Sequence, residues 1–336
     1  MKQKLITFTV CLFVLLVTLT SCSKTKDDDK DTLIYPSFRL GLQQGKGSIE
    51  YRTAELFAQK VEELSKNTIN IKIFPDGILG DDIEMIKGVM NGTLDITYTE
   101  TGRIGLWVNE AKIFGYPFVF DDFEHLSRTI NGEYGKHLWE LFAEHNITVL
   151  ANGYNGTRQT TSNKPIKTID DMKGLRFRVP KSVPNLKFAE LCGALPEIVP
   201  FNEVYRQLKA GLIDAQENPL PTIFSNNFYE VQSCLALTSH IINDNNIIIS
   251  TSSYDLLQDW QKDAIKEAAS IAEKYLTESF RTEERQILKF FHDRGMIITL
   301  PNREPLRQAC LPLYYDYIQK FGDEAYNAIQ QARDQK

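Results

Sequence analysis

Hydrophobic residues between positions 38 and 99 follow two different patterns. Short apolar runs at 38–42, 69–73 and 94–99 predict strands, and in the second run isoleucines alternate with polar residues. Between the runs, apolar residues recur every three or four positions, which predicts helices at 51–64 and 83–90. Strand, helix and strand at this spacing form a βαβ unit, which implies a parallel sheet with helices on its faces.

The rest of the chain continues this alternation of strands and helices. The patterns predict strands at 147–151, 197–199, 212–214 and 241–250, and helices at 123–142, 184–192 and 202–208, the last capped by Asn202. A final helical pattern runs from Tyr254 to about Asp293 without glycine or proline. That length is unusual for a globular helix, so we expect it to bend, to break or to span two domains.

Two arginines stand out in the stretch 152–180. Arg158 lies in a turn rich in Gly and Asn, and Arg178 lies on a run that alternates apolar and basic residues. A guanidinium is always charged and presents a planar fork of donors, which suits bidentate binding of a carboxylate. The alternation places Arg176 on the same face as Arg178, so it does not choose between these two.

Further polar residues follow predicted strands. Glu100 and Arg103 come directly after the strand at 94–99, and Asn218 follows the strand at 212–214. Ligands of open α/β sheets bind beyond the carboxyl ends of strands, so these residues are candidates for a site. The alternatives are a surface ion pair for Glu100 and Arg103, and a turn before Pro219 for Asn218.

The first residues have the pattern of an export signal. A basic head with Lys2 and Lys4 precedes an apolar run at 5–19, too short for a stable membrane-spanning helix. Leu-Thr-Ser-Cys at 19–22 resembles a bacterial lipobox, which predicts a signal peptide at 1–21 and lipid on Cys22. An ordinary signal peptide with an incidental cysteine is the alternative.

The segment after the signal is almost free of apolar residues. Positions 22–33 are rich in Lys and Asp and cannot bury enough surface to offset the entropy of ordering. We expect a disordered tether that holds a globular body away from a membrane.

Charge and cysteine content narrow the class of protein. The chain carries 38 Lys and Arg against 44 Asp and Glu, and loss of residues 1–21 removes two lysines, so the mature net charge is 36 − 44 = −8. An acidic body argues against nucleic acid as a partner, and any anion site must be made by local basic groups. The remaining cysteines are expected to be buried free thiols rather than a disulfide framework: Cys192, Cys234 and Cys310.

Short catalytic motifs are absent from the sequence. It has no G-x-S-x-G, H-E-x-x-H, P-loop or C-x-x-C, and its five histidines lack the spacing of metal ligands. We therefore expect no cofactor, no metal and no enzymatic activity. A hydrolase of acidic sugars remains an alternative, because its paired carboxylates leave no short motif.

Four ordered blocks carry a family resemblance: YNGTRQTTSN, DMKGLRFRVP, PFNEVYRQLKAGLIDAQENP and FYEVQ. With them the chain resembles the substrate-binding proteins, of the DctP type, of TRAP (tripartite ATP-independent periplasmic) transporters. Among these it is most similar to the sialic-acid-binding members. The resemblance extends over nearly the whole mature body, from GLQQG at position 41 to Asn245.

The resemblance implies a two-domain clamshell, like that of periplasmic binding proteins, with α/β domains, mixed sheets, crossing strands and a long domain-spanning helix. On this interpretation domain I comprises 34–155 and about 245–284. Domain II comprises 156–244 and about 285–336. A ligand would bind in the cleft between them.

The resemblance also assigns roles to residues. It makes Arg178 the main carboxylate anchor, with Arg176 outside the site, and Arg158 the second anchor. Asn218 completes the polar set, and Phe201 packs on the ligand.

Blocks of the sialic-acid-binding members supply further contacts, which correspond here to Asp82, Glu100 and Arg103. Where those members carry Asn, this chain has Gln43, one methylene longer. The exact acid therefore stays open, and a hexuronate or another C4–C6 acid is the alternative to sialic acid.

The implied function is that of an extracytoplasmic receptor, a periplasmic or cell-surface lipoprotein, which delivers its ligand to a membrane permease. Transport in this family runs on an ion gradient, so no ATP site is expected. We expect an electropositive patch that is closed by a hinge motion, with Arg158, Arg178 and Asn218 near one flank. Gln43, Asp82 and Glu100 would lie on the other.

Overall fold

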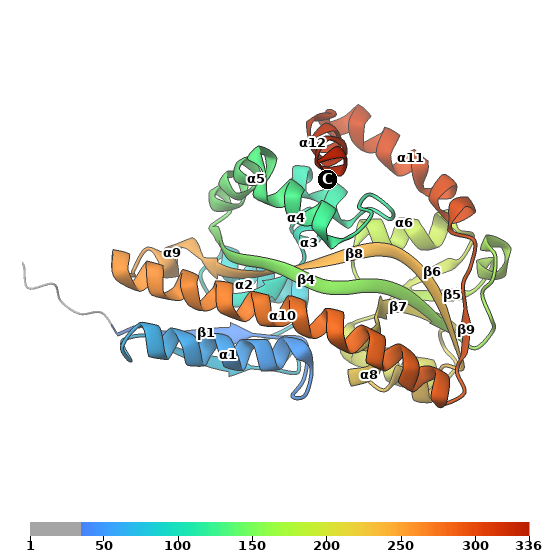
Figure 1. Cartoon of the computed structure of the whole chain (residues 1–336), viewed down its shortest axis with the longest axis horizontal. Coiled ribbons are helices and arrows are strands. Elements are labelled where there is room, and N and C mark those ends of the chain that lie inside the picture. The colour runs from blue at the N-terminus through green and yellow to red at the C-terminus, as the bar shows by residue number, and fades with distance from the viewer. Residues whose placement is uncertain (1–34, 336) are drawn as a thin grey trace, which may run out of the picture. The chain divides into compact units, whose positions relative to one another are not determined.

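Two long antiparallel strands, β4 (Ile147–Ser162) and β8 (Cys234–Ser250), cross the middle of the structure (Figure 1). They pair along most of their length, with three shifts of register, one of them between Tyr154 and Thr157. Both strands are much longer than their hydrophobic patterns predict, because the patterns end where polar residues begin and the pairing continues through those residues.

The computed structural model describes residues 35–335. The predicted signal peptide 1–21, the lipid acceptor Cys22 and the tether 22–33 lie outside the described residues.

The other strands extend a single mixed sheet on either side of this pair, in the order β2-β1-β3-β8-β4-β7-β5-β6, with β9 paired to β8. Pairing is parallel among β1, β2 and β3 on one side and among β5, β6 and β7 on the other, and antiparallel where β8 and β4 join them. The bounds are β1 (Ser37–Gly41), β2 (Asn70–Phe74), β3 (Ile96–Thr99), β5 (Arg176–Val179), β6 (Leu195–Ile198), β7 (Ala215–Pro219) and β9 (Ile297–Thr299).

This arrangement confirms the α/β class, the crossing strands and the βαβ unit at the start of the body. The division into domains at 155/156 and 244/245 stays a prediction, because the sheet is continuous across both points.

Helices cover both faces of the sheet (Figure 1). The α-helices are α1 (Ile49–Leu64), α2 (Asp82–Met90), α3 (Thr101–Ile104), α4 (Phe123–Asn131), α5 (Glu133–Glu144), α6 (Val183–Leu191), α7 (Val204–Lys209), α8 (Leu220–Ser225), α9 (Thr251–Tyr254), α10 (Asp259–Asp293), α11 (Arg303–Phe321) and α12 (Glu324–Asp334). Short 3-10 turns are η1 (Asn109–Gly115), η2 (Ile169–Met172), η3 (Phe201–Glu203) and η4 (Phe228–Glu230).

Successive side chains of β8 point alternately into two hydrophobic cores, one on each face of the sheet. Ile247 and Ile249 pack with α1 and α10, whereas Ile248 packs with the cluster formed by α2, α4, α5, α6, α11 and α12. Successive strand residues point to opposite faces, so three consecutive isoleucines supply both cores.

Helix α10 is unbroken for 35 residues, roughly 50 Å, and runs alongside the halves of the sheet on either side of β4 and β8. Its successive turns contribute to three hydrophobic clusters, through Ala268, Phe280 and Phe291. The prediction of a long helix that spans the body is confirmed, but its predicted start at Tyr254 is wrong, because α9 ends there and α10 begins at Asp259.

Three other predictions of local structure are wrong. Residues 123–142 form two helices rather than one, since Gly132 adopts an extended backbone that ends α4 and begins α5. The strand predicted at 212–214 starts later, at Ala215. Asn202 caps no helix; it lies inside η3, and α7 begins at Val204.

Candidate ligand-binding site

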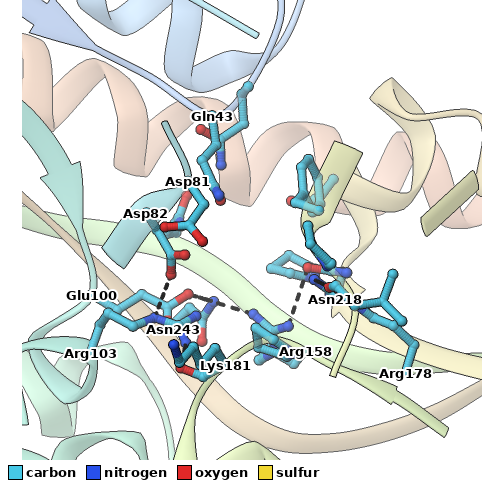
Figure 2. A pocket seen from close by; sticks show the side chains of 18 of the residues that line it. Gln43, Asp81, Asp82, Glu100, Arg103, Arg158, Arg178, Lys181, Asn218 and Asn243 are labelled. Carbon is cyan, nitrogen blue, oxygen red and sulfur yellow. Dashed lines mark hydrogen bonds and ion pairs between the residues drawn. The ribbon is translucent and has the colours of Figure 1, made fainter. Parts of the chain in front are cut away.

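A cavity of about 310 Å³ opens beside the crossing strands. It is lined by all eight residues for which the sequence predicts a ligand contact: Gln43, Asp82, Glu100, Arg103, Arg158, Arg178, Phe201 and Asn218. Figure 2 labels seven of the eight, all except Phe201, and shows that their side chains come from different elements and surround one space. The structure thus brings the predicted set together, while the contacts to a ligand stay predictions.

Arg178 lies on β5, between Phe177 and Val179, which point into the core on the other face. Its guanidinium is buried and donates from Nε and Nη2 to the carbonyl oxygen of Val199, at 3.0 and 2.9 Å. Within the described residues it has no acidic partner, and the ring of Phe201 lies 6.0 Å from its central carbon. Burial lowers the pKa of Arg178 to about 9, which still leaves the group charged at neutral pH. Arg178 is therefore a buried cation that forms no ion pair within residues 35–335, although the more distant carboxylate of Glu217 raises its pKa in part.

Arg176, two positions earlier on the same face of β5, lies outside the cavity lining. Its guanidinium forms a fork with Asp214, with Nε to Oδ2 at 2.9 Å and Nη2 to Oδ1 at 2.7 Å. Asp214 precedes β7, and both side chains are partly exposed, so this ion pair lies at the protein surface. The structure distinguishes the two arginines as the resemblance implies.

Arg158 differs from Arg178 in having a dedicated acidic partner. Its Nε and Nη2 donate to the two carboxylate oxygens of Glu217, and Nη2 also donates to the side chain of Asn218 at 3.2 Å. Glu217 pairs with Thr160 across β4 and β7, two positions from Arg158, so the two charged side chains share one face of the sheet. Only Nη1 faces the other wall, 3.5 Å from Glu100.

Glu217 is fully buried and accepts further hydrogen bonds from Asn185, at 3.1 Å, and from His240, at 3.2 Å. Burial alone would raise its pKa, but Arg158 and the bond from His240 outweigh this and lower the pKa of Glu217 to about 2. Burial lowers the pKa of His240, which is therefore neutral at pH 7. Because a carboxylate only accepts, His240 carries its proton on Nε2, and Nδ1 accepts from Thr238 at 2.9 Å.

This network was missed from the sequence. The signal for Glu217 was its place beside Asn218 in QENP, but a predicted strand that ended at Asp214 put Glu217 in a turn rather than opposite Thr160, diagonal to Arg158. With β7 at 215–219, strand pairing alone predicts the contact.

The opposite wall is built around helix starts. Asp82 is the first residue of α2, whose cap is fixed by reciprocal bonds between Asp81 and Glu84. Asp82 binds Nε of Arg103 at 2.8 Å, and Nη1 of Arg103 donates to the carbonyl oxygen of Lys181 at 3.0 Å. The surface ion pair considered for Glu100 and Arg103 is absent from the described ion pairs, since each contacts another residue.

Glu100 precedes α3 but makes no capping bond, so its carboxylate is available to the cavity. It accepts from Asn243 at 2.9 Å. Asn243 is a lining residue on β8 that the sequence reasoning also missed.

The expectation of an electropositive patch is wrong in its simple form. Acidic and basic lining residues are equal in number: Glu50, Asp81, Asp82 and Glu100 against Arg103, Arg158, Arg178 and Lys181. Arg103 and Arg158 are paired, and Lys181 is exposed. The buried positive charge that remains unpaired is confined to Arg178.

Residues 35–335 contain neither a metal-binding cluster nor a membrane-spanning helix nor a disulfide. No group of three or more His, Cys, Asp or Glu is arranged to hold a metal ion there. No described helix has the length and apolar character that a membrane crossing requires. The expected free thiols are confirmed, because Cys192, Cys234 and Cys310 are all buried without a disulfide.

Comparisons with known proteins agree on one family. A family model described as bacterial extracellular solute-binding protein, family 7 (DctP), matches residues 40–320. The sialic acid-binding periplasmic protein SiaP of Vibrio cholerae is 42% identical over 287 residues, 85% of this chain and 89% of that protein.

Two solved structures are also similar. The sugar acid binding protein DctPAm of Advenella mimigardefordensis, in complex with galactonate, aligns with a TM-score of 0.84 and 27% identity over 89% of this chain and 99% of that one. A TRAP periplasmic solute binding protein of Roseobacter denitrificans with bound β-D-glucuronate has the same TM-score and identity, over 88% and 99%.

One acidic residue of the cavity predicts a pH dependence of stability. Burial raises the pKa of Glu50 from 4.5 to about 7, despite hydrogen bonds from its own amide and from Ser48. Between pH 4.5 and 7 the folded state therefore holds a proton that the unfolded state has lost, so stability falls as pH rises through this range.

Glu50→Gln removes this titration. We expect the free energy of unfolding of the variant, relative to wild type, to increase by on the order of 3 kcal/mol between pH 4.5 and pH 8. Urea unfolding of both proteins at the two pH values measures the change. A difference that stays constant with pH would show that Glu50 is ionised in the folded state throughout.

Proposed function

Because this chain belongs to the bacterial extracellular solute-binding proteins of family 7, we propose that it is the receptor of a TRAP transporter, which captures a sugar acid by its carboxylate and delivers it to membrane permease subunits. The observation that carries the proposal is the buried guanidinium of Arg178, which lacks a counter-ion and lines a cavity of the size of a small ligand.

Arg178 is suited to an incoming carboxylate. Its present acceptor, the carbonyl oxygen of Val199, is neutral and occupies Nε and one hydrogen of Nη2. The two terminal nitrogens still have hydrogens to donate, and a carboxylate there would add both a second fork and the missing negative charge. Binding would thus relieve the cost of a buried, uncompensated cation.

Arg158 and Asn218 would supply a second set of contacts. The fork of Arg158 is held by Glu217, so it offers the ligand a terminal nitrogen in a fixed position rather than a free fork. Asn218 is held in turn by Arg158 and by Gln216, to which its amide donates at 2.6 Å. Such prior ordering reduces the entropy lost on binding.

For the ligand itself we favour sialic acid. SiaP of Vibrio cholerae, which is 42% identical, is a sialic acid-binding protein. In addition, the wall formed by Gln43, Asp82 and Glu100 offers several acceptors for the hydroxyls of a large sugar acid. The second candidate is a hexuronate, because a similar structure holds β-D-glucuronate. A receptor of this kind binds its ligand without chemical conversion, so the purified protein should release each acid unchanged.

We further propose that Cys22 carries the lipid that anchors the mature protein to a membrane. The lipobox-like sequence at 19–22 supports this role, and the polar segment 22–33 would serve as the tether.

Binding tests the main proposal. Arg178→Ala should weaken the affinity for the favoured acid by about 10- to 100-fold or more, since a buried hydrogen bond to a charged group contributes about 1.5–3 kcal/mol. Arg176→Ala is the matched control, from the same face of the same strand, and should bind as wild type does.

Isothermal titration of the three proteins measures these affinities, after a thermal-shift panel of N-acetylneuraminate, D-glucuronate, D-galactonate and a C4 dicarboxylate has identified the acid. The largest shift is expected with N-acetylneuraminate. No shift with any acid, turnover of an acid, or unchanged affinity in Arg178→Ala would each contradict the proposal.

The anchor is tested in cells. Metabolic labelling with a fatty acid should label the wild-type chain and leave Cys22→Ser unlabelled and released from the membrane fraction. Equal labelling of the two would assign the lipid elsewhere, and no labelling of wild type would support an ordinary signal peptide.

A further inference from the structure

A small recess of about 60 Å³ extends from the main cavity on the side away from Arg178. Seven residues line both the recess and the cavity: Gln43, Gln44, Glu50, Asp82, Glu100, Arg103 and Asn155. Figure 2 shows Gln43, Asp82 and Glu100 on the wall that faces Arg178. Tyr98 lines the recess alone. Neither Arg178 nor Arg158 lines the recess. A ligand held at Arg178 would therefore reach it only by extending across the cavity.

The recess contains unsatisfied polar atoms. Within residues 35–335, four buried side-chain atoms lack a hydrogen-bond partner, and three of them belong to residues that line this recess: Oε1 of Glu50, the hydroxyl of Tyr98 and Oδ1 of Asn155. The fourth, on Arg333, lies 2.9 Å from a carboxylate oxygen of Asp121. An unmet buried polar atom is costly, so three in one small space indicate an occupant that hydrogen-bonds to them.

Each of the three comes from a different element. Glu50 is the second residue of α1, Tyr98 lies on β3, and Asn155 lies on β4 within the shift of register that follows Tyr154. The exposed fractions of Glu50 and Asn155 are 4% and 9%. The first turn of a helix and the interiors of two paired strands therefore hold these atoms in place. Rigid placement of this kind favours selective binding of one ligand.

The donor and acceptor types identify the occupant. Two of the atoms are oxygens that accept when Glu50 is ionised, and the third is a phenol that both donates and accepts. Two neighbouring hydroxyl groups match all three, because one can donate its hydrogen to the carboxylate and the other to the amide oxygen, while either accepts from the phenol. An acetamido group would instead place its methyl group against polar atoms that it cannot satisfy.

We propose that this recess binds the hydroxyl-bearing tail of a sugar acid longer than a hexuronate, and that Tyr98, with Glu50 and Asn155, selects such acids over six-carbon ones. The inference rests on the proposed function, since it takes the carboxylate to be held at Arg178. A hexuronate, whose carboxylate is attached to its ring, has no tail to enter the recess, and water molecules would remain there.

Tyr98→Phe tests the assignment, because it removes one hydroxyl and keeps the ring that packs with the core around α1. Its affinity for N-acetylneuraminate should fall about 3- to 10-fold, the effect of one neutral hydrogen bond, while its affinity for D-glucuronate stays unchanged. Tyr254→Phe, from the same hydrophobic cluster but outside the cavity and the recess, is the control and should match wild type for both acids. Thermal melts of the free proteins verify that the variants fold.

A second comparison alters the ligand instead. N-acetylneuraminate shortened by two carbons of its tail should bind wild type more weakly, and the further loss in Tyr98→Phe should be smaller than with the full ligand. Equal losses for both acids, or no loss for N-acetylneuraminate, would show that the recess holds water only and would overturn the assignment. Wild type that binds no sugar acid would contradict the proposed function itself, and this assignment with it.

Discussion

Glu217 neutralises Arg158 and leaves Arg178 without a counter-ion. Both charged partners of that pair are buried, and removal of either would leave an uncompensated charge in a medium of low polarity. The pair is completed by Asn185 and by neutral His240, whose ring stacks on Phe188 with 4.0 Å between centroids. Among the buried arginines of residues 35–335, Arg103 and Arg158 form ion pairs, and Arg178 does not.

The crossing strands make this division of charge possible. Arg158 lies where β4, still paired with β8, begins to pair with β7 on its other edge. Its fork can therefore reach Glu217 on β7, while its remaining nitrogen faces Glu100. The wall with Asp82 and Glu100 is set by helix starts, and the wall with Arg178 is set by a strand end. A ligand bound between them would contact elements from both sides of the sheet.

Local sequence patterns and the family resemblance together predicted the α/β architecture and the residues that line the cavity. Alternation put Arg176 and Arg178 on one face, and the resemblance placed only Arg178 in the site. Of the two, Arg178 lines the cavity, while its role as an anchor stays a prediction. The partner of Arg158 was beyond that reach, because it depends on which residues of β7 oppose β4, and an error of a few residues in the strand start hid Glu217. Helices α11 and α12 were not predicted either. Pro312 lies inside α11, and a proline in a helix interior argues against a helix unless tertiary packing compensates.

The unpartnered atoms of Glu50, Tyr98 and Asn155 have no signature in the sequence. Each residue type is ordinary at its position, and only the packing of α1, β3 and β4 shows that no partner among the described residues reaches them. The proposed carboxylate site could therefore be predicted from the sequence, whereas the proposed selection among acids depends on atoms that only the folded cavity brings together.

The most direct test of the account is a crystal structure of the protein with its bound acid. We predict that the ligand carboxylate lies within about 3.2 Å of the two terminal nitrogens of Arg178, while the fork of Arg158 stays on Glu217. A carboxylate bound away from Arg178, or a Glu217 released so that Arg158 becomes the anchor, would contradict it.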